Sequence, residues 1–162
     1  MIKPGDRLPA MKLMRAASEG PQEVDIGTLF AGKTVVLFAV PGAFTPTCSA
    51  RHLPGYLEHY DSLRARGVDE VICIAVNDVF VMKAWAASQN GADRITFLAD
   101  GSGLFTRAVG LELDLTARGL GVRSQRYALI AKDGVITHLA VEQAGGFEVS
   151  RAEAILEALP SS

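Results

Sequence analysis

The sequence lacks the features that mark membrane-spanning and nucleic-acid-binding proteins. No apolar run approaches the roughly 20 residues that a membrane-spanning helix needs, so no membrane partner is expected. Positive charge is not in excess, because 16 Lys and Arg stand against 18 Asp and Glu and the formal net charge is −2. This balance gives no electrostatic basis for binding nucleic acid or an anionic membrane surface.

Cysteine is scarce, with only Cys48 and Cys73 in the whole chain. The N-terminal segment has no apolar signal-peptide core, and Asp6 is atypical of a transit peptide, so we expect a cytoplasmic location. In a reducing compartment, two cysteines do not form a structural disulfide framework. Each is therefore either an inert residue or one with a chemical role.

The length and composition predict one globular domain over residues 1–162. Apolar residues make up 49% of the chain and charged residues 21%, the proportions of an ordinary soluble protein. Three β-rich apolar runs predict buried strands at Thr34–Val40, Val71–Val76 and Ile95–Ala99. Asp133-Gly134 predicts a tight hairpin between two further strands.

Helix signals fall between these strands. Asp78 can cap one helix, and Ser150 with Glu153 predicts a capping box at the start of the last one. Residues 111–124 are predicted to be irregular. Parallel crossovers followed by a hairpin predict an α/β fold with three layers, a thioredoxin-like arrangement in which a central mixed sheet has helices on both faces.

The most informative stretch, residues 41–48, reads Pro-Gly-Ala-Phe-Thr-Pro-Thr-Cys and follows a predicted strand directly. Thr45 can cap a helix, Pro46 suits its first position, and Cys48 then falls in the first turn. The unpaired N–H groups and the helix dipole favour a thiolate there. Pro54 is expected to kink or restart this helix.

A reactive thiolate also needs donors that orient its substrate and stabilise developing charge. Thr45 offers a hydroxyl one turn away from Cys48. A guanidinium is the best cation because it stays charged and presents several donors. Position along the chain does not select among the candidates Arg51, Arg123 and Arg126.

These residues fit a known pattern. Pro41-x-x-x-Thr45-x-x-Cys48 resembles the active-site signature of peroxiredoxins, and the longer stretch Gly42–Gly55 is similar to the peroxiredoxin 5, or plant type II, branch. The resemblance runs from about residue 25 to residue 159. Further segments that match this branch are Val76–Trp85, Phe97–Ser102, Gly110–Asp114 and Gly119–Tyr127.

The resemblance implies a thiol peroxidase that reduces hydrogen peroxide and alkyl hydroperoxides, with a role in antioxidant defence. Cys48 would attack the hydroperoxide and become a sulfenic acid. Thr45 would hydrogen-bond the peroxide, Pro41 would shield the site from water, and Arg126 would stabilise the thiolate. Two further residues would belong to the substrate pocket: Gly42 and Phe44. No cofactor and no metal are implied.

The resemblance leaves the reductant open. The loop 142–150, where animal members of the branch carry a resolving cysteine, has none here. Cys73 matches the second cysteine of plant members, but it lies in a predicted buried strand, where cysteine usually serves as a small apolar filler. We therefore expect an external thiol, glutathione with glutaredoxin, with thioredoxin as the alternative. Members of the branch commonly form homodimers.

Three other interpretations of Cys48 are open. A thioredoxin-type disulfide oxidoreductase is disfavoured, because Thr45 stands where such enzymes carry their first cysteine. A redox sensor that passes oxidation from Cys48 to a partner protein is the non-enzymatic alternative. Cys48 and His52 could share one helix face and bind a metal, but no further ligands occur at fitting spacing.

Overall fold

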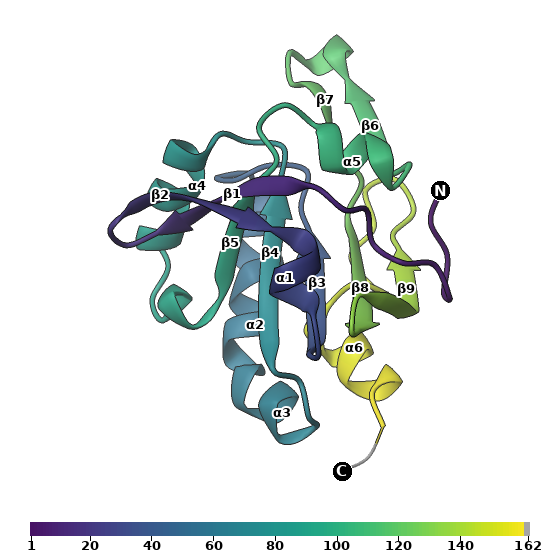
Figure 1. Ribbon diagram of the computed structural model, residues 1–162. Coiled ribbons are helices and arrows are strands. Elements are labelled where there is room, and N and C mark those ends of the chain that lie inside the picture. Colours follow the sequence, from purple (N-terminus) through teal and green to yellow (C-terminus); the bar gives the residue numbers. More distant parts are fainter. Residues whose placement is uncertain (161–162) are drawn as a thin grey trace.

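The computed structural model describes residues 1–160 and shows one large mixed sheet with helices packed on both faces (Figure 1). The sheet has seven strands in the order β2-β1-β5-β4-β3-β8-β9. Strand β4 runs parallel to β3 and β5, whereas β1 and β8 run antiparallel to their neighbours β5 and β3. The predicted α/β fold is confirmed. The strands are β1 (Lys12–Ala17), β2 (Gly20–Asp25), β3 (Thr34–Ala39), β4 (Glu70–Ala75), β5 (Thr96–Ala99), β8 (Tyr127–Lys132) and β9 (Val135–Val141).

Side chains are buried on both faces of the central strands, and this produces three layers. Along β3, Val36 and Phe38 belong to one core, whereas Val35 and Leu37 belong to the other. A strand that is covered on both faces reads as a continuous apolar run, which is why β3 and β4 stand out in the sequence.

Short helices cover the two cores. Helices α2, α3, α4 and α6 contribute to the first core, and α1 and α5 to the second. Within residues 1–160, no helix is long and apolar enough to cross a membrane. The helices are α1 (Ile26–Phe30), α2 (Leu53–Glu58), α3 (Tyr60–Ala65), α4 (Val79–Ala87), α5 (Leu104–Ala108) and α6 (Ala152–Ala158).

The helix that begins at Pro46 changes its hydrogen-bond pattern ahead of Pro54, where the sequence predicts a kink or a restart. Its second part is a π-helix, η1 (Cys48–His52), which ends where the N–H of Leu53 donates to the carbonyl of Cys48. Pro54 has no N–H and cannot continue the helical hydrogen bonds, so the chain passes through a wider turn before α2 begins.

Two predictions about the second half of the chain are wrong. Residues predicted to be irregular form β6 (Glu112–Leu115) and β7 (Gly121–Ser124), a separate two-stranded antiparallel sheet. These strands are short and only half-buried, so they carry no strong apolar pattern. The capping box is also absent, because the Ser150 hydroxyl donates to Glu142 and leaves α6 without a side-chain cap.

The predicted turn between β8 and β9 is confirmed. Asp133 and Gly134 have φ angles of 51° and 77°, the left-handed pair that a tight hairpin of this kind requires. Antiparallel pairing of β8 with β3 then brings the start of β8 next to the end of β3, where Ala39 pairs with Tyr127. This relationship positions the candidate active site.

Candidate active site

Cys48 lies at the end of a short loop that leaves strand β3, and its side chain is fully buried. The loop is fixed by two polar contacts. The hydroxyl of Thr45 donates to the Gly42 carbonyl at 2.6 Å, and the N–H of Ala43 donates to Asn77 Oδ1 at 2.9 Å. Since Asn77 follows β4, the second contact ties the loop to the neighbouring strand and holds the sulfur at the sheet edge.

The side chain of Thr45 does not cap the helix, contrary to the sequence-based expectation, because its hydroxyl donates to the Gly42 carbonyl. Its backbone carbonyl still accepts from the N–H of Ser49 at 2.9 Å, so the residue stands at the helix start. Phe44, one residue earlier, has a φ of 62°, which is uncommon for an aromatic residue. Its ring is 56% exposed, so the strained turn directs it outward rather than into a core.

Arg126 is the cation that reaches the sulfur. It directly precedes β8, and its Nη2 donates to Cys48 Sγ at 3.2 Å although the two residues lie 78 positions apart. Arg123 packs against the same loop, with its Nη1 2.9 Å from where a Cβ on Gly42 would stand, but its Nε donates to the Leu120 carbonyl and it forms no hydrogen bond to Cys48. Arg51 forms no hydrogen bond to Cys48 either. The tertiary structure thus selects one of the three candidates.

His52 holds the same guanidinium in place. Its Nδ1 accepts from Arg126 Nη1 at 2.8 Å, and its Nε2 lies 3.1 Å from the carbonyl of Ser150. A carbonyl only accepts, and a guanidinium only donates, so Nε2 carries the proton and Nδ1 presents its lone pair. Burial, reinforced by the Arg126 charge, lowers the pKa of His52 to about 3, and the ring is neutral.

The sequence alone indicates His52 only as a possible metal ligand. Within residues 1–160 no group of three or more His, Cys, Asp and Glu side chains could hold a metal ion. The signal that could have indicated its role is the spacing from Cys48. The two residues are four positions apart on one short helical segment, so both side chains can meet a third group, and that group is Arg126.

A second set of contacts fixes Ser150, the partner of His52. The Ser150 carbonyl also accepts from the Tyr56 hydroxyl at 2.7 Å, and its N–H and hydroxyl donate to Glu142 Oε2 at 2.8 and 2.6 Å. The N–H of Glu142 in turn donates to the carbonyl of Arg126 at 2.9 Å. His52 and Arg126 are thus held next to each other by the loop between β9 and α6 and by the start of β8.

A cavity of about 180 Å³ lies beside Arg126. Pro41 lines it, whereas Gly42 and Phe44 do not. The shielding role of Pro41 and the place of Gly42 and Phe44 in a substrate pocket stay predictions. The lining residues are Pro41, Thr47, Leu113, Gln125, Arg126, Glu142, Gln143, Ala144, Gly145 and Gly146.

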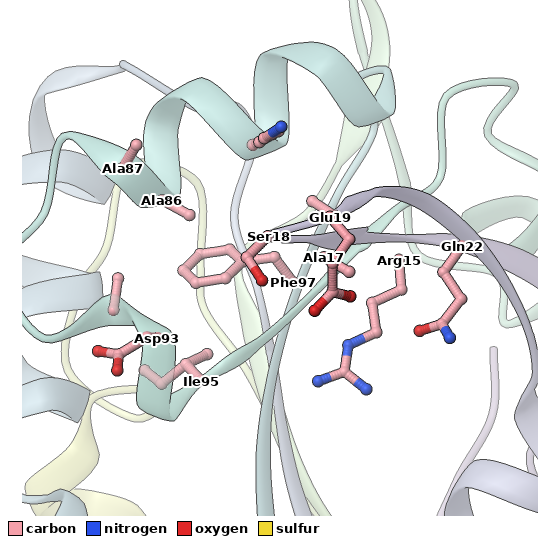
Figure 2. A pocket seen from close by; sticks show the side chains of 13 residues that line it. Arg15, Ala17, Ser18, Glu19, Gln22, Ala86, Ala87, Asp93, Ile95 and Phe97 are labelled. Atoms are coloured by element: carbon pink, nitrogen blue, oxygen red, sulfur yellow. The ribbon is translucent and has the colours of Figure 1, made fainter.

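A larger cavity, of about 510 Å³, lies away from the thiol, between the β1–β2 turn, α4 and the start of β5 (Figure 2). Its floor is apolar, with Ile95 and Phe97, and charged side chains such as Arg15, Glu19 and Asp93 stand around it. Neither cavity is lined by a cysteine, so the hydrogen bond between Arg126 and Cys48, and not cavity size, identifies the candidate active site.

Cys73 lies in the middle of β4, where it pairs with Phe38 on one side and Phe97 on the other. The side chain is fully buried, as predicted, and both cysteines are free thiols. Burial raises the pKa of the Cys73 thiol well above its ordinary value, and the nearby charge of Cys48 adds to the effect. An uncharged, inaccessible thiol of this kind is a poor nucleophile.

The arrangement suits one kind of chemistry. A buried sulfur at a helix start accepts a hydrogen bond from a fixed guanidinium, and a small cavity opens beside that guanidinium. Such a cation stabilises negative charge on the sulfur and can also donate to an oxygen that gains charge during the reaction. The site can therefore perform a nucleophilic displacement on a small electrophile with an oxygen leaving group.

Comparison with known proteins agrees with this thiol chemistry. The family model described as Redoxin matches residues 3–156. Peroxiredoxin-2C of Oryza sativa subsp. japonica is 51% identical over 156 residues, which cover 96% of this chain and 96% of that protein. The structure of reduced Prx3 of Vibrio vulnificus in complex with hydrogen peroxide has a TM-score of 0.94 at 54% identity and covers 99% of this chain and 100% of its own. Peroxiredoxin 5 of Alvinella pompejana has a TM-score of 0.86 at 35% identity, with 98% and 97% covered.

Proposed function

Because this chain belongs to the peroxiredoxin family and is a thiol-dependent peroxidase with an antioxidant function, we propose that Cys48 is its reacting residue and that a small external thiol restores it. The hydrogen bond from Arg126 Nη2 to Cys48 Sγ is the observation that carries this assignment. Within residues 1–160, Cys73 is the other cysteine, and it lies inside the sheet without access to solvent.

The first half of the reaction follows from this geometry. The Cys48 thiolate attacks the terminal oxygen of a hydroperoxide, and an S–O bond forms as the O–O bond breaks. The departing oxygen takes up a proton and leaves as water or an alcohol, while Cys48 becomes a sulfenic acid. Arg126 stabilises the thiolate beforehand and the charge on the leaving oxygen during the step. Thr45 and Pro41 complete the site in this proposal.

The assignment is tested by following peroxide consumption with hydrogen peroxide and tert-butyl hydroperoxide. Cys48→Ser should abolish consumption of both, because serine is no nucleophile under these conditions. The matched control is Cys73→Ser, which removes the other thiol. Peroxide turnover that survives Cys48→Ser would contradict the proposal.

For the reductant we favour glutathione with glutaredoxin, in a cytoplasmic setting, over thioredoxin. Burial of Cys73 and the lack of a cysteine in the loop 142–150 support an external thiol of either kind, and the preference for glutathione follows the similarity to plant members of the family. An intramolecular disulfide would require the two sulfurs to come into direct contact and the site to open. Parallel steady-state assays with both reductants, on wild type and Cys73→Ser, decide the matter. Loss of turnover with every reductant in a folded Cys73→Ser variant would favour an internal resolving thiol.

We also propose that the protein forms a homodimer through the loops at the active-site edge of the sheet. Three large apolar side chains are exposed there, Phe44 at 56%, Phe80 at 70% and Leu104 at 62%. They follow β3, β4 and β5, parallel strands whose carboxyl ends meet at one edge. Sedimentation at increasing concentration should show a dimer that Phe80→Asp weakens. A wild type that stays monomeric would refute this proposal.

A further inference from the structure

We propose that Arg51 and Arg151, which flank the ring of Phe147 beside the active site, bind the carboxylate of the small thiol that reduces oxidised Cys48. The inference rests on the proposed function, since it names the substrate class of the second half of that reaction. The ligand chemistry is a thiol that carries a carboxylate, and glutathione is the probe of that class.

Phe147 lies in the loop between β9 and α6, and guanidinium groups surround it. The Cζ atom of Arg51 lies 4.8 Å from the ring centroid, that of Arg151 5.2 Å, and that of Arg126 5.9 Å. The ring also meets His52 edge-on, with the two centroids 5.1 Å apart. Three cations from three separate segments therefore converge on one aromatic ring, and one of them is the cation that contacts Cys48.

Carboxylates of the protein balance little of this positive charge. Arg151 pairs with Glu153 at 3.4 Å, but neither Arg51 nor Arg126 forms an ion pair with any carboxylate among residues 1–160. The Nε atom of Arg151 is buried and has no hydrogen-bond partner. Clustered guanidinium groups repel one another, and a carboxylate that accepts from their planar donors removes that repulsion.

The peroxide is a poorer candidate for this position than the reductant. The cavity beside Arg126 has a volume of about 180 Å³, which is sufficient for a small hydroperoxide, and hydrogen peroxide carries no carboxylate that the two arginines could bind. Arg51, by contrast, belongs to the same π-helix as Cys48 and is exposed to solvent. An anionic thiol can therefore be recruited close to the oxidised sulfur without entering the peroxide cavity.

The recruited thiol completes the catalytic cycle in two displacements. Its sulfur attacks the sulfenic sulfur of Cys48, an S–S bond forms as the S–O bond breaks, and the hydroxide takes the thiol proton and leaves as water. A second thiol attacks the mixed disulfide, so that a free disulfide and the Cys48 thiolate are released. The two thiols are oxidised and the sulfenic acid is reduced, which balances the two electrons gained by the peroxide.

The experiment isolates the second half of the reaction. The full-length protein is oxidised with one equivalent of hydrogen peroxide, formation of the sulfenic acid is confirmed by mass spectrometry, and its reduction is timed with glutathione or with uncharged 2-mercaptoethanol. The variants are Arg51→Gln, Arg151→Gln and the charge-preserving Arg51→Lys. The matched control is Arg15→Gln, which removes an equal charge on β1, beside the other cavity (Figure 2).

We expect Arg51→Gln and Arg151→Gln to slow reduction by glutathione about five- to tenfold, the effect of losing one charge-assisted hydrogen bond. Reduction by 2-mercaptoethanol should stay unchanged, and Arg51→Lys should retain most of the glutathione rate. Added salt should slow glutathione more strongly in wild type, Arg51→Lys and Arg15→Gln than in Arg51→Gln or Arg151→Gln. Equal slowing of both thiols, or no slowing of glutathione, would overturn the inference. Failure of wild type to form a sulfenic acid would instead refute the proposed function.

Discussion

His52 Nδ1 accepts a hydrogen bond from Arg126 Nη1 at 2.8 Å, while the other terminal nitrogen of the same guanidinium donates to Cys48. The histidine thus fixes the plane of the group that stabilises the thiolate. It forms hydrogen bonds to Arg126 and Ser150 but not to the sulfur, and it does not line the cavity beside Arg126, so it is a positioning residue. Its effect on the reaction must pass through Arg126.

Replacing His52 with Ala should therefore slow oxidation of Cys48 by hydrogen peroxide about 10- to 100-fold, in line with the loss of orientation of one charge-stabilising donor. His52→Gln should recover part of this loss, because an amide oxygen can accept from Arg126 while the amide nitrogen donates to Ser150. Competition kinetics on reduced protein measure both rates. If Ala and Gln behave alike while the fold is intact, His52 does not act through Arg126.

The neutral state of His52 also predicts a pH dependence of stability. Its pKa is about 3 in the folded protein, below the ordinary 6.5. The unfolded chain therefore binds the additional proton, and stability that is fully present above pH 6.5 is lost as the pH falls from 6.5 toward 3. The loss attributable to this group reaches up to about 5 kcal/mol. Urea denaturation of wild type between pH 7 and pH 4 should show the decline.

His52→Gln should flatten that decline, because glutamine does not titrate. The matched control is His138→Gln, which removes a half-buried histidine from β9 and should leave the slope of wild type unchanged. A variant His52→Gln with the same slope as wild type would show that other groups cause the acid sensitivity.

Arg126→Lys tests whether charge alone is sufficient at the active site. Lysine keeps the positive charge, but a single ammonium group does not reproduce the planar pair of donors that meet Cys48 and His52 together. We expect Arg126→Met to slow Cys48 oxidation by about 10²-fold or more. The rate of Arg126→Lys should lie between those of Arg126→Met and wild type. Stopped-flow kinetics provide the measurement, and an Arg126→Lys rate equal to that of wild type would contradict the geometric argument.

Ser49 and Trp85 connect the π-helix to α4. The Trp85 indole N–H donates to the Ser49 hydroxyl at 2.9 Å, and Trp85 is the single tryptophan of the chain. Ser49→Ala leaves a buried donor without a partner and should destabilise the fold by about 1–3 kcal/mol. Ser62→Ala, on the exposed face of α3, is the matched control and should cost little. Urea denaturation followed by tryptophan fluorescence measures both, and equal stabilities would show that the contact contributes nothing.

Local patterns predicted most of the elements but not all of them. Continuous apolar runs revealed β3, β4 and β5, because strands covered on both faces need apolar side chains throughout. The strands β6 and β7 were missed, since they are short, partly exposed and paired only with each other. The predicted capping box failed for another reason: Ser150 forms a tertiary contact with Glu142, which competes with the local one.

The sequence by itself determined which thiol is the candidate nucleophile and the turn that carries it, because Pro46, Pro54 and the residues around Cys48 act through local backbone geometry. The family resemblance indicated Arg126, but only the tertiary structure shows that its guanidinium reaches the sulfur. Antiparallel pairing of β3 with β8 places Arg126 against a sulfur that lies 78 positions away in the chain. The role of His52 is likewise a property of the fold, because burial keeps its ring neutral and Ser150 fixes the tautomer that receives Arg126.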